Sequence, residues 1–489
     1  MIGNSKPVGR RLFLAGGTLT LAAACTGVSQ KEYDALKAQL EATKGQTVVH
    51  AGNLQPAPAA AQLTGWDTPQ SIRGDLRVAA TYDSSGPDAW SARDHPLVYV
   101  ASEGKGYAHR PSGTNSLPGV QIIDANTKKV VASALFDLGF KTHGTPHGLG
   151  ISPDGKWLYV ATGEGDHAMT AAEGTARLLI VNARTLKLAM TLTTDRSSGR
   201  LRGFHHIEAF KDWQGQDRIL MQDQSTTRWI LDPKDNHRVV KAITLDDVGP
   251  MGHPYSTVDP SGKFLYMNIS SPEIREAGGL AGVAKVDLEK GTITQILGMH
   301  AGNPIGMVHT ADGKFTYVAE GHGSVVYKID NAQNKIVGST SAGVAGPYGL
   351  ALNWDESELY AMGKGEGSHN TGGVVGVIDT KTFRPTQLFD QPMNIGGSII
   401  DHGIVHPDPN VNEMWVSSAG TWETIVVDLA TRKVKARIPS PNGGDTHNGG
   451  FVRYNSDFTG ELLADMGGPQ RDMYATRKER VAKLAAAKP

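Results

Sequence analysis

Short apolar runs and polar turns alternate along the chain in a unit that recurs from about residue 76 onward. One copy has an apolar run at 146–152, a polar turn at Asp154-Gly155-Lys156, and a strand-like segment at 157–160 that is rich in aromatic and β-branched residues. Later in this unit a third apolar segment ends at Val181-Asn182. Such short patterned runs between Gly/Asp turns predict β-strands. The turn and the following strand recur at 259–267, 310–318 and 354–361.

Seven such units can be counted. Six open near residues 146, 206, 253, 304, 347 and 402. The seventh holds strands at 95–101 and 119–124, and we expect its inner strand to come from 447–455 at the far end of the chain. Four short strands in each unit of roughly 50 residues are typical of propeller blades. We therefore predict an all-β fold, a seven-bladed β-propeller over residues 76–460 with a short N-terminal helical stalk, whose closed ring hides its sheet edges.

The segments outside the ring have other compositions. Residues 1–25 carry Arg10-Arg11 before an apolar run that ends at Cys25, a pattern typical of a Tat export signal with a lipobox-like end. Residues 26–75 form the predicted stalk and linker, with helical charge spacing at 31–44. Residues 461–489 form the predicted C-terminal tail, with a short helix at its end. We expect a periplasmic protein, and attachment to a membrane through a lipidated Cys25 stays open.

Composition narrows the chemistry. The net charge is −1 and aromatic residues make up 7% of the chain, without an interleaved basic patch, so no nucleic-acid partner is expected. Cys25 is the single cysteine of the sequence, which excludes a disulfide and a multi-thiolate metal site. A metal ion would have to be held by histidine, carboxylate or backbone groups.

Histidines recur where the inner strand of a blade begins, next to the central channel. Neighbouring side chains of a strand point to opposite faces, so adjacent His205 and His206 can serve one site only where the backbone is still turning. Aligning the units on their turns places Ile305 and Tyr348 at the two entrances without histidine. His309 lies deeper on its strand. The predicted metal ligands, which suit copper, zinc, iron or nickel, are His109, His147, His205, His206, His253, His309, His402 and His447.

Two resemblances sharpen this prediction. Tyr99-Val100 and the segments 158–162 and 316–319 resemble the repeats of YVTN propellers. His205-His206, followed by 222–228 and by the interval to His253, resembles the first copper-binding blade of nitrous oxide reductases. That resemblance implies a copper cluster of two or more ions. The cysteine-rich second copper domain of that family has no counterpart here, so by elimination the chain is most similar to the thiocyanate dehydrogenases.

The second resemblance implies a copper-dependent oxidoreductase acting on a small inorganic anion. Thiocyanate would be oxidised to cyanate and sulfur, with electrons passed to an external acceptor such as a cytochrome c. We expect Glu208 to act as the base, Asp223 as a second carboxylate and Lys105 as the charge that attracts the anion.

Two other functions stay open. One is a d-type haem-binding or haem-maturation propeller, since a covalent c-type haem is excluded by the lack of a Cys-x-x-Cys-His motif. The other is a cofactor-free YVTN binding or scaffold propeller, in which the histidines are structural. A homodimer also stays open.

Overall fold

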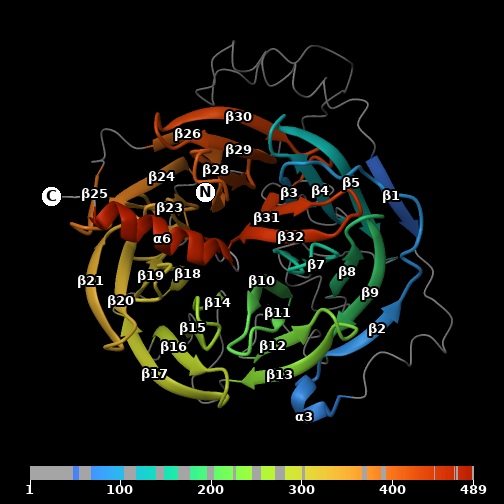
Figure 1. Cartoon of the computed structure of the whole chain (residues 1–489), viewed down its shortest axis with the longest axis horizontal. Helices are drawn as coiled ribbons and strands as arrows, with labels where there is room; N and C mark the ends of the chain where they lie inside the picture. Colours follow the sequence, from blue (N-terminus) through green and yellow to red (C-terminus); the bar gives the residue numbers. More distant parts are fainter. Residues whose placement is uncertain are drawn as a thin grey trace, which may run out of the picture.

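The computed structural model describes the repeat region and short flanking segments. The described residues are 48–53, 68–103, 117–138, 148–162, 177–194, 203–223, 227–244, 255–269, 281–299, 303–365, 372–386, 393–444, 446–466, 468–469 and 472–486. The predicted export signal and the helix expected at 31–44 lie outside these residues. Seven β-sheets stand around a common axis (Figure 1). The predicted seven-bladed propeller is therefore confirmed.

Blade 1 is built from both ends of the chain. Its sheet order is β1-β5-β4-β3-β31-β32-β33, so the late strand β31 pairs with the early strand β3, as predicted. This pairing closes the ring and covers the edge that β3 would otherwise expose. The strands are β1 (Val48–Asn53), β3 (Leu97–Glu103), β4 (Pro118–Asp124), β5 (Lys129–Asp137), β31 (Thr446–Tyr454), β32 (Gly460–Asp465) and β33 (Gly468–Pro469).

The other six blades follow one another along the chain. Blade 2 consists of β6 (Leu149–Ile151), β7 (Trp157–Ala161), β8 (Leu178–Asn182), β9 (Lys187–Thr193) and the outer β2 (Arg77–Thr81). Blade 3 consists of β10 (Phe204–Lys211), β11 (Asp217–Asp223), β12 (Thr227–Asp232) and β13 (Arg238–Thr244). Blade 4 consists of β14 (Ser256–Val258), β15 (Phe264–Ile269), β16 (Ala281–Asp287) and β17 (Thr292–Met299). Blade 5 consists of β18 (Pro304–His309), β19 (Phe315–Glu320), β20 (Val325–Asp330) and β21 (Lys335–Ser341). Blade 6 consists of β22 (Pro347–Leu352), β23 (Glu358–Gly363), β24 (Gly372–Asp379), β25 (Arg384–Pro385) and β26 (Met393–Ser398). Blade 7 consists of β27 (Ile400–Val405), β28 (Glu413–Ser418), β29 (Glu423–Asp428) and β30 (Lys433–Pro439).

Burial falls from the middle strands to the outer strand of a blade. Every residue of β16 is buried, because blades pack on both of its faces, whereas β21 alternates between exposed and half-buried positions. This explains why the middle strands have nearly continuous apolar sequences while the outer ones are mixed. The short helix α3 (Gln70–Arg73) lies against the outer edge of blade 3, where the indole of Trp229 donates to the carbonyl oxygen of Arg73.

The inner strands of blades 3, 5, 6 and 7 share a β-bulge near the channel mouth. In each of them two residues lie opposite one residue of the neighbouring strand, which turns the backbone and re-aims both side chains. The bulged pairs are His205-His206, Ile305-Gly306, Tyr348-Gly349 and Asp401-His402. This register corrects the sequence alignment, which placed His402 at the same position as Ile305 and Tyr348. His402 instead occupies the second position of its bulge, as His206, Gly306 and Gly349 do.

Neighbouring bulges touch one another around the mouth. A Cβ atom on Gly349 would lie 2.5 Å from the carbonyl oxygen of Asp401 and 2.8 Å from Nδ1 of His402. A Cβ atom on Gly306 would lie 2.0 Å from the carbonyl oxygen of Tyr348. Glycine at these positions lets adjacent inner strands approach, since any side chain would separate them. The contact places Tyr348 and His402 side by side.

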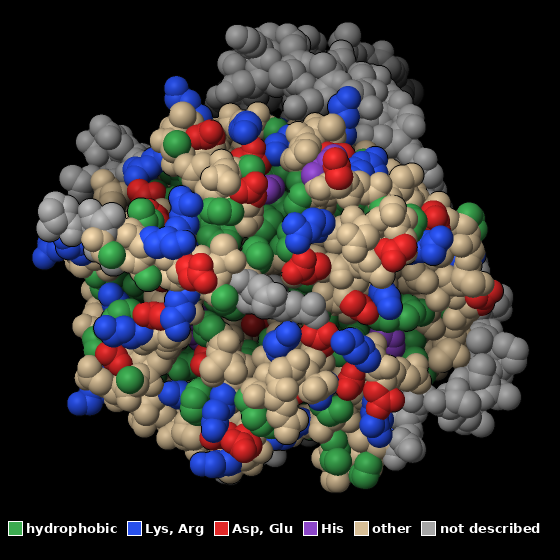
Figure 2. Space-filling model, viewed as in Figure 1, with side chains coloured by type: hydrophobic (Ala, Val, Ile, Leu, Met, Phe, Trp, Pro, Cys, Tyr) green, Lys and Arg blue, Asp and Glu red, His purple; other side chains and the backbone are tan. Residues whose placement is uncertain are grey.

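The C-terminal segment extends into the ring instead of leaving it. Strand β32 pairs with β31 on its inner side, and α6 (Asp472–Ala486) crosses the ring in Figure 1. Leu463 and Ala464 of β32 pack with Ile404 and Phe451 in one apolar cluster. On the face that carries α6, acidic and basic side chains are interspersed (Figure 2). Within the described residues, no helix combines the length and the apolar character that a membrane span requires.

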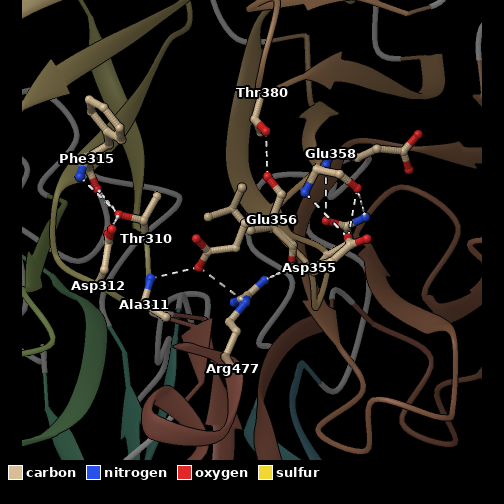
Figure 3. A network of polar contacts seen from close by, with 12 residues as sticks. Thr310, Ala311, Asp312, Phe315, Asp355, Glu356, Glu358, Thr380 and Arg477 are labelled. Atoms are coloured by element: carbon tan, nitrogen blue, oxygen red, sulfur yellow. Dashed lines mark hydrogen bonds and ion pairs between the residues drawn. The ribbon is translucent and has the colours of Figure 1, made fainter. Parts of the chain in front are cut away.

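Arg477 fixes α6 to blade 6. Its side chain is 3% exposed, and it donates to the carbonyl oxygens of Leu352 and Asn353. Its Nε atom lies 3.5 Å from Oε1 of Glu356, which also accepts the backbone N–H of Ala311 at 2.7 Å (Figure 3). Burial raises the pKa of Glu356, and Arg477 opposes that rise. Arg477 therefore joins the helix to blade 6, and Glu356 links this contact to the turn of blade 5.

Arg477→Ala should lower the free energy of unfolding by about 3 kcal/mol, because two carbonyl groups and a buried carboxyl lose their cationic partner. Lys478→Ala, one residue further on an exposed position, should change it by less than about 0.5 kcal/mol. Denaturant titration of both variants measures the difference. Equal stabilities would show that Arg477 does not anchor the helix.

Candidate metal centre

Both imidazoles of the His205-His206 pair lie on the same side of β10. The Nδ1 atoms of the two rings are 2.7 Å apart, and the rings are nearly perpendicular with centroids 4.1 Å apart. The side chains are 0% and 3% exposed. The bulge explains this arrangement, because in a regular strand the two rings would point to opposite faces. From the sequence we predicted that the two histidines can serve one site only where the backbone turns. The turn is a bulge, and it lies inside β10 rather than before the strand.

Two further histidines complete a compact group at the channel mouth. Nε2 of His206 lies 2.9 Å from Nε2 of His402, and the ring of His447 lies 6.1 Å from that of His402. We call His205, His206, His402 and His447 the histidine cluster. These residues come from blades 3, 7 and 1, so strands distant in the sequence supply one site.

Aromatic rings flank the histidine cluster. The ring of Tyr255 is 5.0 Å from that of His206, and the ring of Tyr348 is 5.1 Å from that of His402. Burial, followed by electrostatic repulsion from the neighbouring His447, Lys364 and His205 side chains that disfavours a charge on His402, holds the pKa of His402 well below its usual range. His402 is therefore neutral at pH 7 and has a lone pair to offer, which is the form of imidazole that binds metal ions.

The His206–His402 pair fits a transition-metal ion. Two nitrogens that bind one ion at about 2.0–2.1 Å and subtend about 90° lie about 2.9 Å apart, which matches the distance between these Nε2 atoms. That angle belongs to the square-planar or tetragonal geometry of copper(II) and nickel(II). His205, in contrast, directs its Nδ1 atom toward His206. In the part of the chain that the structure describes, no group of three or more His, Cys, Asp or Glu residues is arranged to hold an ion.

Three of the predicted ligands, His109, His147 and His253, lie outside the described residues, as does Lys105. The neighbours of two of them reach the histidine cluster. Gly148 packs so closely on blade 3 that a Cβ atom there would lie 2.9 Å from the carbonyl oxygen of His205. Tyr255 contacts His206 as described above.

His309 stays apart from the histidine cluster. Its Nδ1 atom lies 2.8 Å from the hydroxyl oxygen of Thr316 on the adjacent strand, and its ring packs 5.0 Å from that of Tyr266 in the next blade. These contacts place it between blades. The bulge explains the difference from the sequence expectation, because the extra residue changes the facing of every position that follows it.

Glu208 lies beyond the histidine cluster, against blade 4 and the inserted strand β32. Its Oε1 atom accepts from the hydroxyl of Thr257 at 3.2 Å and from the backbone N–H of Val258 at 3.3 Å. Burial, and then the charge of Asp465, raise the pKa of Glu208 well above its usual range. Both effects favour the protonated form of the carboxyl, which opposes the expected role of Glu208 as a base.

Asp223 ends β11 and is 1% exposed. Its charge opposes the effect of burial on Arg228, whose pKa is lowered to about 10. The guanidinium of Arg228 donates to Ser256 at 2.8 Å and to the carbonyl oxygen of Thr227 at 3.0 Å. The structure thus places Asp223 as a counter-charge to a buried arginine.

Two charged residues of the site were missed in the sequence. Asp401, 1% exposed, lies with one carboxylate oxygen 3.4 Å from Nζ of Lys364 and with the other 3.4 Å from Nε2 of His447. The ammonium of Lys364 also lies over the ring of Tyr348, 3.9 Å from its centroid. One signal was available: Asp401-His402 is, like His205-His206, a pair of polar residues at the start of an inner strand. Lys364 follows β23 and had no comparable signal.

Comparisons with known proteins show distant similarity only, and the propeller fold rests on the seven sheets described above. No protein-family model matches the chain, and no curated protein matches it. The solved structure of dihydro-heme d1 dehydrogenase NirN in complex with DHE is similar over 80% of this chain and 82% of that chain, with 14% identity and a TM-score of 0.46. A functionally unknown protein from Desulfotomaculum acetoxidans is similar over 73% of this chain and 99% of that chain, with 12% identity and a TM-score of 0.49. The resemblance to copper-cluster propellers therefore stays a prediction.

The buried histidines predict acid sensitivity. Burial lowers the pKa of His237 to about 4, of His309 to about 3 and of His406 to about 4. In the unfolded chain these groups take up protons below about pH 6.5. Stability is therefore fully present above that pH and is lost as the pH falls toward the folded pKa values.

Denaturant titrations between pH 8 and pH 4 should show this loss, to which His237 contributes up to about 3 kcal/mol. His237→Gln should lose less stability than the wild type over the same range, because glutamine takes up no proton. Parallel curves for the two proteins would contradict the assignment.

Proposed function

We propose that this protein is an exported β-propeller that binds a transition-metal ion, or a metal cofactor, through imidazoles at the mouth of its channel. The observation that carries the proposal is the pair of buried nitrogens, Nε2 of His206 and Nε2 of His402, held 2.9 Å apart by two bulges on different blades. Two neutral imidazoles at this distance satisfy cis positions of one ion.

Other features of the chain agree with imidazole ligation. The single cysteine belongs to the predicted export signal, so histidine is the soft-to-borderline ligand that remains. His447 lies beside the pair, and the residues that follow His147 and His253 approach it. Export by the Tat route to the periplasm fits a protein that folds, and takes up its metal, before it crosses the membrane. Whether Cys25 is lipidated stays a prediction.

The first candidate is a copper-dependent oxidoreductase acting on a small inorganic anion. Bound copper would polarise a water molecule and take up electrons. For thiocyanate, the anion and one water would give cyanate, elemental sulfur, two protons and two electrons, the electrons passing to an acceptor such as a cytochrome c. In this chain Lys364 would attract the anion. Glu208, in its ionised form, would accept one of the two protons that the reaction releases. Tyr255, whose ring packs on that of His206, lies near Glu208.

The second candidate is a haem-binding propeller. Haem iron can be held by a single imidazole, which His206 or His402 could supply. A haem of the d type carries carboxylates, which Lys364 could pair with. The structure of dihydro-heme d1 dehydrogenase NirN is only distantly similar to this chain, and this similarity does not favour its ligand here.

His206→Ala and His402→Ala should each lose at least half of the metal bound by protein exported through its own signal. His95→Ala removes a partly buried histidine that pairs with Asp94 and Asp124 in blade 1 and should leave the metal content unchanged. Elemental analysis measures the content. Full occupancy in both cluster variants would refute the proposal.

A visible spectrum of the same protein separates the candidates. Copper without a haem band would favour the oxidoreductase and justify an assay with thiocyanate, whereas a haem band would favour the second candidate. Neither metal nor colour, together with no uptake of added copper, would leave a cofactor-free binding propeller.

A further inference from the structure

Asp401 occupies the first position of the bulge in blade 7, and its partner in the bulge is His402. Its carboxylate is almost fully buried and bridges two groups from other blades. Oδ1 lies 3.4 Å from Nζ of Lys364, and Oδ2 lies 3.4 Å from Nε2 of His447. A buried carboxylate needs positive or N–H partners to remain ionised. Lys364 supplies the charge, and its own place is fixed by the ring of Tyr348.

The position of this carboxylate has a consequence for His447. A neutral imidazole carries its proton on one nitrogen and a lone pair on the other. If the lone pair were on Nε2, it would face a carboxylate oxygen inside the protein, where the repulsion is poorly screened. The proton is therefore favoured on Nε2, and the lone pair is favoured on Nδ1.

We propose that Asp401 is a positioning residue that holds His447 in the Nε2–H tautomer, so that His447 offers Nδ1 as its ligand atom. This differs from His206 and His402, whose Nε2 atoms face each other. A carboxylate that orients a metal-binding histidine in this way also raises the basicity of the ligand nitrogen. The part of the proposal that concerns a ligand atom rests on the metal-binding function proposed above, whereas the tautomer itself does not.

The tautomer can be read without metal. Ring ¹⁵N chemical shifts of histidine-labelled protein distinguish the two neutral forms, and the spectrum of His447→Gln identifies the signals of His447. The wild type should show His447 with its proton on Nε2. Asp401→Asn should shift His447 toward a mixture of tautomers, because an amide can either accept or donate a hydrogen bond. His447 protonated on Nδ1 in the wild type, or an unchanged signal in Asp401→Asn, would overturn the proposal.

Copper(II) binding gives the second measurement. Asp401→Asn should bind added copper about 10- to 100-fold more weakly than the wild type in competition with a chelator. Asp408→Asn removes an exposed carboxylate after the end of β27 and should bind as the wild type does. Equal affinities of wild type and Asp401→Asn would refute a role for Asp401 in ligation. A wild type that binds no copper would instead refute the metal-binding function and leave the NMR test of Asp401 intact.

Lys364→Met separates the two partners of Asp401. If Asp401 acts on His447 directly, this variant should keep the Nε2–H tautomer. If the tautomer is lost, the ion pair with Lys364 and not the carboxylate itself is responsible, and the proposal fails in its present form. Should Asp401→Asn not fold, Asp401→Glu keeps the charge, and its His447 signals should stay closer to the wild type than to a mixture.

Discussion

The close contact between neighbouring inner strands at the channel mouth is the constraint on which the candidate site depends. The bulges of blades 6 and 7 meet where Gly349 leaves room for the backbone of Asp401 and for the ring of His402. This contact holds Tyr348 against His402 and brings His402 within 2.9 Å of His206. A side chain at Gly349 would push the blades apart by more than the tolerance of a metal–ligand bond. Backbone packing, rather than the histidines themselves, therefore sets the geometry of the site.

Much of the architecture could be read from the sequence, because it is repeated. The secondary structure of a single short segment such as β7 is ambiguous in the sequence. The turn before it recurs in several blades, and this repetition identifies the segment as a propeller strand. The closing strand β31 was predicted for a related reason, since blade 1 had outer strands and no inner one. The insertion of β32 beside β31 had no such signal, because 460–465 resembles an ordinary apolar strand.

The site could be read only in part, and the bulge is the reason. An extra residue in a strand leaves no mark in the pattern of apolar positions, yet it reverses the facing of the residues that follow it. The position of His206 and His402 at the start of inner strands predicted that they lie together, as they do. His309, three residues beyond its bulge, was assigned to the wrong environment, and Asp401 was overlooked because a charged residue at a strand start is common. The sequence also could not reveal that the pKa of Glu208 is raised, since this depends on burial in the folded protein and on Asp465, which lies 257 positions later.

The order in which the histidine cluster receives its members follows from the closing strand. His205 and His206 are synthesised long before His402, and His447 arrives only with β31, the strand that closes the ring. An unfinished or open propeller therefore has separated imidazoles, and the complete group exists only after β31 has paired with β3. The four histidines lie together only when the ring of blades is closed. Assembly of the histidine cluster is therefore a late and global event, because it waits for the strand that closes the ring.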